Sequence, residues 1–203
     1  MQTREDEIAL AAARLVAEEG LDYAAAKRRA LRDLGLGPRT ALPDNERVED
    51  AVREYLALFM ADTQPRELAV LRAQALRWME RLAPFRPHLA GAVWRGTATR
   101  LSDIVLDLFC DDPKSLEIHL VNQALAYEAR EAPGAGGRVV PQLSLHHVVR
   151  EFNEEVGVHL RVHDLDALRG ALKPDARGRS WRGDARALRA LLADGGAATM
   201  AVP

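Results

Sequence analysis

The sequence is almost free of cysteine and has no long apolar run. Cys110 is the only cysteine among 203 residues, which excludes an intramolecular disulfide framework and a cysteine-rich zinc site. No stretch approaches the roughly 20 apolar residues that a membrane-spanning helix needs. The polar, acidic start MQTREDE does not fit a signal peptide. These absences predict a cytoplasmic protein without a membrane partner.

The sequence also lacks an excess of either charge. The net charge is −2 and the pI is near 6.3, so no global field would attract nucleic acid or an acidic membrane. Lysine is scarce, with three lysines against 25 arginines, and together with abundant alanine this indicates a GC-rich bacterial genome. The Walker P-loop and the Gly-x-Ser-x-Gly nucleophile elbow are both absent. The sequence therefore does not predict a P-loop ATPase or a hydrolase with a nucleophile elbow.

Residues 1–86 have the pattern of a helical region. Thr3 and Asp6 form a predicted capping box for a helix that ends at Gly20. We expect a second helix between Asp22 and Gly35, a third capped by Asn45 and a fourth from about Pro65, with Pro84 and Pro87 closing the region.

The pattern changes after His88. Leu89–Val93 predicts a strand that runs into the turn WRGTATRLS, and DIVLDLF then alternates as a half-buried strand does. Ile104, Leu106 and Leu108 would face the core, which places Asp103 and Asp107 together on the opposite face. Four residues of strand separate these carboxylates by about 13 Å, so one ion would not reach both.

Residues 91–109, GAVWRGTATRLSDIVLDLF, resemble the signature of the nucleotidyltransferase superfamily, which has the DNA polymerase β-like fold. That signature is Gly-Ser, about ten residues that often include Arg-Gly, and then Ser-Asp-x-Asp. Gly91-Ala92, Arg95-Gly96 and Ser102-Asp103 fall on its three parts. The resemblance implies an α+β fold with a small mixed sheet, here residues 87–194, packed against the helical region.

The resemblance also implies a ligand and a cofactor. The turn would hold a nucleotide or another phosphorylated molecule, and carboxylates on the following strand would hold Mg²⁺ for nucleotidyl transfer. The expected catalytic and metal-binding residues are Asp103 and Asp107. The expected nucleotide-binding residues are Gly91, Ala92, Arg95, Gly96, Thr97, Arg100 and Ser102.

Two working positions of the signature are changed. Ala92 replaces the serine, and Val105 replaces the second aspartate, so Asp107 would reach the same ion only through a bulge that shifts the strand register. The family's third carboxylate has no counterpart within the later predicted strands. Two functions stay open: a nucleotide-binding protein with or without Mg²⁺-dependent transfer, and a catalytically inactive regulatory or protein-interaction module that keeps only the fold.

The remaining sequence completes the sheet domain. Asp112-Pro113 begins a helix to about Gln123, VVPQLSLHHVV and VGVHLRVHD are strands, and Asp184 caps a last helix. If these strands share one core, His146, His159, Arg161 and His163 lie on the same hydrated face as the two aspartates. That face is an alternative metal site, although exposed strand histidines explain it more simply.

The C-terminal part contains one further candidate site. Arg177, Arg179 and Arg182 beside Trp181 could hold a phosphate, but a surface loop packed down by Trp181 is the simpler interpretation. The final segment, residues 195–203, is predicted to be disordered.

Overall fold

The computed structural model describes residues 3–134, 139–170 and 178–199, with the side chains of 195–199 excepted. The chain divides into two compact units, which are described separately. The helical unit comprises Met1–Leu68 and Thr97–Leu101, and the sheet unit comprises Ala69–Gly96 and Ser102–Pro203.

The helical unit is built on three helices: α1 (Arg4–Glu19), α2 (Tyr23–Asp33) and α3 (Asn45–Phe59). The predicted capping box is present, since the Thr3 side chain accepts a hydrogen bond from Asp6 N and the Asp6 carboxylate accepts one from Thr3 N at 2.9 Å. Gly20 ends α1 in the left-handed conformation. The cap of α3 is Asp44 rather than the predicted Asn45, because its carboxylate accepts from Arg47 N at 2.7 Å. The core of the unit includes Ile8, Ala12, Leu15, Ala26, Ala30, Val48, Val52 and Leu56.

The boundary between the two compact units lies inside helix α4 (Gln64–Arg81), between Leu68 and Ala69. The C-terminal part of α4 carries an apolar stripe that packs on the sheet, and Trp78 meets the His147 ring edge-on at 5.7 Å between centroids. The segment 97–101 belongs to the helical unit, where the Gln64 side chain donates to Ala98 O at 2.9 Å. The turn of the signature is therefore divided between the units.

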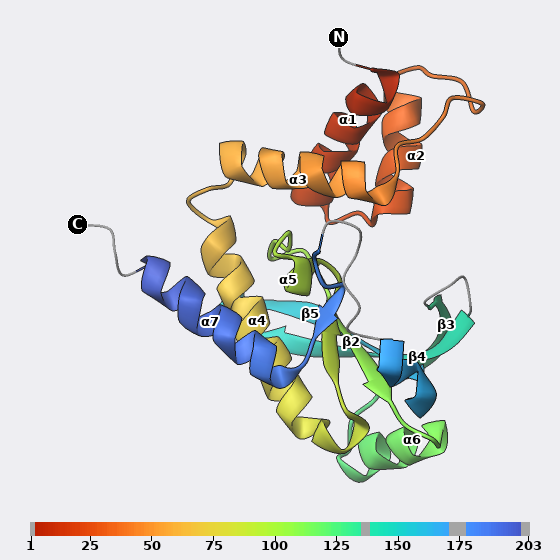
Figure 1. Cartoon of the computed structure of the whole chain (residues 1–203), viewed down its shortest axis with the longest axis vertical. Coiled ribbons are helices and arrows are strands. Elements are labelled where there is room, and N and C mark those ends of the chain that lie inside the picture. Colours follow the sequence, from red (N-terminus) through yellow and green to blue (C-terminus); the bar gives the residue numbers. More distant parts are fainter. Residues whose placement is uncertain (1–2, 135–138, 171–177, 200–203) are drawn as a thin grey trace. The chain divides into compact units, whose positions relative to one another are not determined.

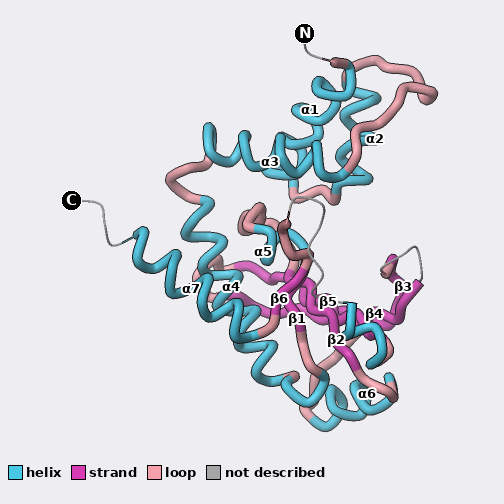
Figure 2. The backbone as a smooth tube through the Cα atoms, viewed as in Figure 1, coloured by secondary structure: helices cyan, strands magenta, loops and turns pink. Residues whose placement is uncertain are grey.

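The sheet unit contains a six-stranded mixed sheet in the order β3-β4-β5-β2-β1-β6, which confirms the α+β class (Figure 1). Strands β2 and β5 are parallel, and the other pairs are antiparallel. Figure 2 shows the strands crossing this unit with helices around them. The strands are β1 (His88–Ala90), β2 (Ile104–Phe109), β3 (Glu128–Pro133), β4 (Val139–Val149), β5 (Glu154–His163) and β6 (Arg182–Gly183).

The two faces of the sheet differ in chemistry. One is apolar and carries Ile104, Leu106, Leu108, Leu143, Leu145, Val158 and Leu160, all buried. The strand registers place Asp103, Asp107, His146, His159, Arg161 and His163 on the other face, which we call the polar face. This shared face was predicted from alternation alone.

A further prediction about local structure is wrong. The strand expected over 89–93 ends at Ala90, because the short helix α5 (Gly91–Arg95) begins there with Gly91 at φ +65°. The last helix is α7 (Ala185–Thr199), and residues 200–203, the end of the segment predicted to be disordered, lie outside the described residues. Helix α6 (Pro113–Asn122) and the Asp184 cap of α7 agree with expectation. In the described parts of the chain, no helix is long and apolar enough to cross a membrane.

Candidate functional site

Each aspartate of the polar face is bonded to its own histidine on β5. Asp103 Oδ2 lies 3.0 Å from His159 Nε2, and Asp107 Oδ1 lies 3.0 Å from His163 Nε2. The parallel register of β2 and β5 pairs Asp107 with Arg161, so each histidine stands two residues beyond the position opposite its aspartate. The two Asp–His pairs therefore have the same two-residue offset between β2 and β5.

Asp103 lies at the open end of the polar face. Its Oδ1 accepts a hydrogen bond from Gly157 N at 2.9 Å, and a Cβ at Gly157 would come within 2.6 Å of that oxygen. Glycine is required here because the carboxylate rests directly on the backbone of β5. The hydrogen bond from His159 holds the pKa of Asp103 below its ordinary value of 3.8, which outweighs the opposing effect of burial.

The hydrogen bonds at this end continue from β5 to β4. His159 Nδ1 lies 2.9 Å from Ser144 Oγ, and the Gln142 amide donates to the same hydroxyl at 3.1 Å. Asp103, which directly precedes β2, is therefore connected through His159 on β5 to Ser144 on β4 by consecutive side-chain hydrogen bonds. Strand alternation puts Ser144 on the face that carries Asp103 and His159, but nothing in the sequence marked it as the partner of His159.

Asp107 lies at the closed end of the polar face. It is 3% exposed, and its second oxygen is 2.9 Å from Arg182 Nη1 on β6. Phe109 stacks on His163 at 5.3 Å between ring centroids, and the Arg182 guanidinium carbon lies 6.0 Å from the Phe109 ring. Asp107 is thus already paired with two cationic or polar partners in a buried cluster.

The residues present do not fit a two-metal site. Pairing between β2 and β5 runs one to one from Ile104 to Phe109, so the bulge that would bring Asp107 toward Asp103 does not form. The only carboxylate that β5 places on the polar face is that of Glu155, which is exposed near the start of the strand, opposite Val148. No group of three or more His, Cys, Asp or Glu that could hold a metal occurs among the described residues.

The residues of the turn on which the sequence resemblance rests, 91–102, are divided between the two units. A Cβ at Gly91 would lie 3.5 Å from Val105 Cγ2, so the turn rests against the position where the family has its second carboxylate. Ala92, Arg95 and Gly96 belong with Gly91 to the sheet unit, and Ser102 directly precedes Asp103. Thr97 and Arg100 belong to the helical unit, where Arg100 N donates to Glu67 Oε2 at 2.9 Å.

A second feature of the sheet unit lies beside α5. A cavity of about 250 Å³ is lined by three arginines from three different segments, and no carboxylate is among the described residues that line it. Two of these arginines were not expected in one site with Arg95. The lining of this arginine pocket consists of Arg72, Trp94, Arg95, Arg179, Ser180 and Leu191.

The arginine pocket is held together by bonds to backbone carbonyls. Arg72 donates to Val93 O at 3.2 Å, and the Trp94 indole donates to Ser180 O at 3.0 Å. Arg95 is 9% exposed and also donates to Ser180 O, at 3.4 Å, while its guanidinium carbon lies 4.5 Å from the Trp181 ring centroid. The guanidinium groups of Arg72 and Arg95 are therefore positioned by the fold before any ligand arrives.

The sequence interpretation located this pocket only in part. Arg95 came from the signature, and Arg179 with Trp181 from the basic C-terminal loop, where the packed-loop interpretation was favoured. Arg182 instead pairs with Asp107, and Arg177 lies outside the described residues. Arg72 carried no signal, because an arginine on a helix is ordinarily solvated.

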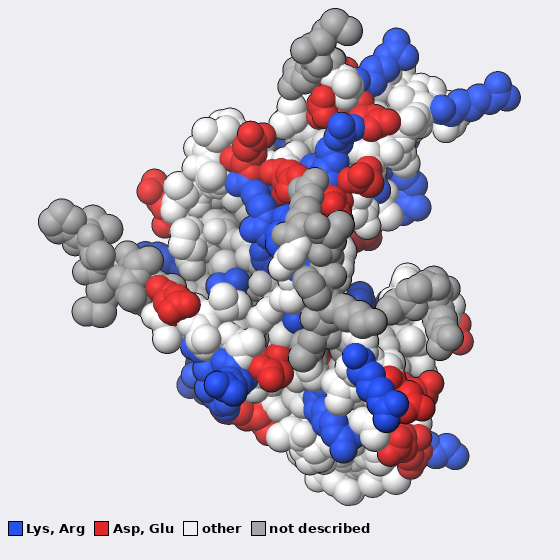
Figure 3. All heavy atoms as spheres, in the orientation of Figure 1, with Lys and Arg blue, Asp and Glu red and all other residues white. Residues whose placement is uncertain are grey.

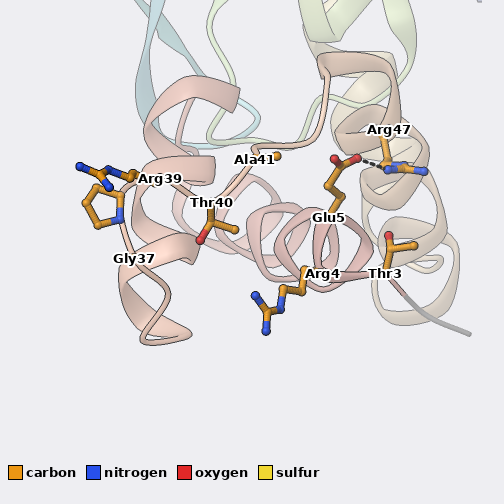
Figure 4. Close-up of a pocket in the computed structure, with 9 residues that line it drawn as sticks. Thr3, Arg4, Glu5, Gly37, Arg39, Thr40, Ala41 and Arg47 are labelled. Carbon is orange, nitrogen blue, oxygen red and sulfur yellow. Dashed lines mark hydrogen bonds and ion pairs between the residues drawn. The ribbon is translucent and has the colours of Figure 1, made fainter.

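A larger pocket, of about 990 Å³, lies in the helical unit between the start of α1 and residues 37–41 (Figure 4). Its lining includes Glu5, whose carboxylate pairs with Arg47, and Figure 4 shows the side chains of Arg4 and Arg39 extending away from this pair. Because its polar groups do not converge, size alone does not make it the better candidate.

Surface charge does not single out another site on the face shown in Figure 3. Basic and acidic side chains are interspersed there. Comparisons of the chain with protein-family models, with curated proteins and with solved structures gave no match. The polar face and the arginine pocket are therefore the two features on which a function can be argued.

Proposed function

We propose that this chain is a nucleotidyltransferase-like protein that binds a nucleotide or another phosphorylated small molecule, with its phosphate in the arginine pocket. The observation that carries the proposal is the convergence of Arg72, Arg95 and Arg179 on one cavity without a lining carboxylate among the described residues. Guanidinium groups match phosphate oxygens in geometry and charge, and their bonds to phosphate are among the stronger hydrogen bonds.

The dimensions of the pocket favour the phosphate end of a ligand. Its volume of about 250 Å³ lies below the roughly 300–1,000 Å³ of sites that enclose a whole drug-sized molecule. The rest of the ligand would extend toward the surface, where Trp181 is 44% exposed. An aromatic ring at that place suits stacking against a base.

The proposal assigns no catalytic step to a metal. Val105 supplies no ligand, and Asp107 is buried in its pair with Arg182, so the chain's own carboxylates do not fit the Mg²⁺ site that the family resemblance implies. Binding without transfer is the function that this donor set supports, which is also what a regulatory protein with a nucleotidyltransferase-like fold would need.

Calorimetric titration tests the proposal, with ATP, CTP, GTP, UTP and pyrophosphate each measured with and without Mg²⁺. Arg72→Gln and Arg179→Gln should each weaken binding about tenfold or more, because each removes charge-assisted hydrogen bonds worth about 1.5–3 kcal/mol. Arg130→Gln is the matched control, since Arg130 is exposed on β3 and pairs with Glu128 away from the pocket.

The outcomes separate the functions left open by the sequence. Binding that survives without Mg²⁺ and is lost in the two pocket variants supports the proposal. Binding that requires Mg²⁺ and disappears in Asp103→Ala would support a working transferase instead. If none of the five ligands binds, the chain keeps the fold without the ligand, and a protein-interaction role takes the place of the proposal.

A further inference from the structure

We propose that Ser144 is a reactive nucleophile, with His159 as its general base and Asp103 as the group that orients the imidazole. The proposal is independent of nucleotide binding, since none of the three residues lines the arginine pocket. It rests on the hydrogen-bonded chain that links β4, β5 and β2 at the open end of the polar face.

The partners of each group indicate which atom donates and which accepts in these hydrogen bonds. An ionised Asp103 only accepts, so the proton between it and His159 sits on Nε2 of the imidazole. On a neutral imidazole Nδ1 is then the acceptor. The Ser144 hydroxyl, at 2.9 Å, is the nearer donor to it, and the Gln142 amide nitrogen lies farther away, at 3.4 Å. The Gln142 amide donates to Ser144 Oγ, which leaves the hydroxyl proton free to point at the imidazole.

This order of groups is the one that activates a weak nucleophile. A hydroxyl must lie within hydrogen-bond reach of a base, and a third group must fix the tautomer of that base. Here the imidazole uses Nδ1 toward the hydroxyl and Nε2 toward the carboxylate, and either ring nitrogen can take a proton. Gly157 completes the arrangement, because only a residue without Cβ lets Asp103 lie in place.

The hydrogen-bonded series Ser144–His159–Asp103 is most exposed to solvent at Asp103. The side chains of Asp103 and His159 are 51% and 27% exposed, and Ser144 is 9% exposed. Arg161 stands opposite Gln142 in the β4–β5 register, and its buried Nε has no hydrogen-bond partner within the described part of the chain. It brings positive charge to the face where an oxyanion would develop. Because Ser144 is the most buried of the three groups, the substrate that suits it is a small ester with an unbranched acyl group.

The reaction of such a nucleophile with this substrate is the hydrolysis of an ester. Ser144 Oγ bonds to the carbonyl carbon while its proton moves to His159 Nδ1, and the bond to the alcohol breaks as the alcohol takes that proton. Water then attacks the acyl-serine, giving one proton to Nδ1, and the acid leaves as Ser144 recovers the proton. The sum is ester plus water giving acid plus alcohol.

Acylation with 4-nitrophenyl acetate, followed by intact-mass measurement and peptide mapping, tests the proposal on the full chain. We expect one acetyl group on Ser144, removed by hydroxylamine, and none in Ser144→Ala. His159→Gln should slow acylation about 10²-fold, and Asp103→Asn at least about tenfold. Ser115→Ala is the matched control, because the Ser115 hydroxyl donates to a backbone carbonyl, Asp112 O, rather than to an imidazole.

Several results would overturn the proposal. These are no adduct on Ser144 of the folded protein, acetylation confined to lysines or the N-terminal amine, and an unchanged rate in His159→Gln. If Ser144→Ala does not fold, Ser144→Cys keeps the question open to measurement. Its thiol should react with iodoacetamide faster than Cys110 does, and this advantage should disappear when His159→Gln is added.

Discussion

The two ends of the polar face contain the same pair of residues in different surroundings. Asp103–His159 and Asp107–His163 have the same 3.0 Å contact and the same offset between β2 and β5. The side chains of the first pair are 51% and 27% exposed, whereas those of the second are 4% and 7% exposed. Local geometry is shared, and only burial and the third partner differ.

The third partner decides what each pair can do. Asp107 is neutralised by Arg182 and enclosed with Phe109, so its carboxylate contributes to folding and is closed to ligands. Asp103 is held by Gly157 N, and its histidine is bonded onward to Ser144. The same two-residue motif is therefore structural at one end and chemically usable at the other, and substitutions at the two ends should separate these roles.

The largest expected effect is that of Asp107→Asn. It leaves Arg182, whose side chain is 15% exposed, without its countercharge, and breaking a buried ion pair in this way costs about 3–5 kcal/mol. Urea unfolding followed by circular dichroism measures the loss. Adding Arg182→Gln should recover part of it, because no unpaired charge then remains. A loss no greater than that of Asp103→Asn would mean that the two ends are equivalent.

A smaller effect is expected for Gly157→Ala. The new methyl group would lie 2.6 Å from Asp103 Oδ1, so the carboxylate must move and its bonds to Gly157 N and His159 weaken, costing about 1–3 kcal/mol. The free energy of unfolding should show this loss in the single variant. When Gly157→Ala is added to Asp103→Ala, the further loss should be nearly absent, because no carboxylate then opposes the methyl group. Equal losses in both backgrounds would contradict the contact.

Asp103→Asn should be milder still, at about 0.5–1.5 kcal/mol, because the half-exposed pair loses its charge while an amide oxygen can still accept from Gly157 N. The more informative measurement is the histidine NMR spectrum. The His159 resonances should shift strongly and those of His163 should stay unchanged. A comparable shift in both would show that the ends are coupled.

The smallest effect is the dependence of stability on pH. Because the pKa of Asp103 is lowered in the folded protein, its charge stabilises the fold above the unfolded value near 3.8. That contribution is lost as the pH falls through the lower folded value. Between about pH 5 and pH 2, wild type should lose more stability than Asp103→Asn, by under about 1 kcal/mol because solvent screens the exposed carboxylate. Urea unfolding at each pH measures the difference, and identical slopes would contradict it.

The arginine pocket illustrates the limit of reading a site from a motif. Arg95 was placed by the signature, but its partners in the pocket come from α4 and from the segment before β6. Nothing in the spacing of Arg72 or Arg179 marks them, since their convergence depends on how Trp94 packs on Gly183, where a Cβ would lie 2.0 Å from the indole. Such contacts between distant segments leave no periodic pattern.

The sequence by itself determined the local structure and the division of the sheet into two faces. Helix caps such as Thr3, Asp22 and Asp184 are bonds within a few residues, and strand alternation has a fixed period, so both can be read from order alone. Only the tertiary structure decided which residues of the polar face meet. The parallel register of β2 and β5 and the arrival of Arg182 from β6 are set by packing across the chain. That packing buried Asp107, left Asp103 open, and joined His159 to Ser144.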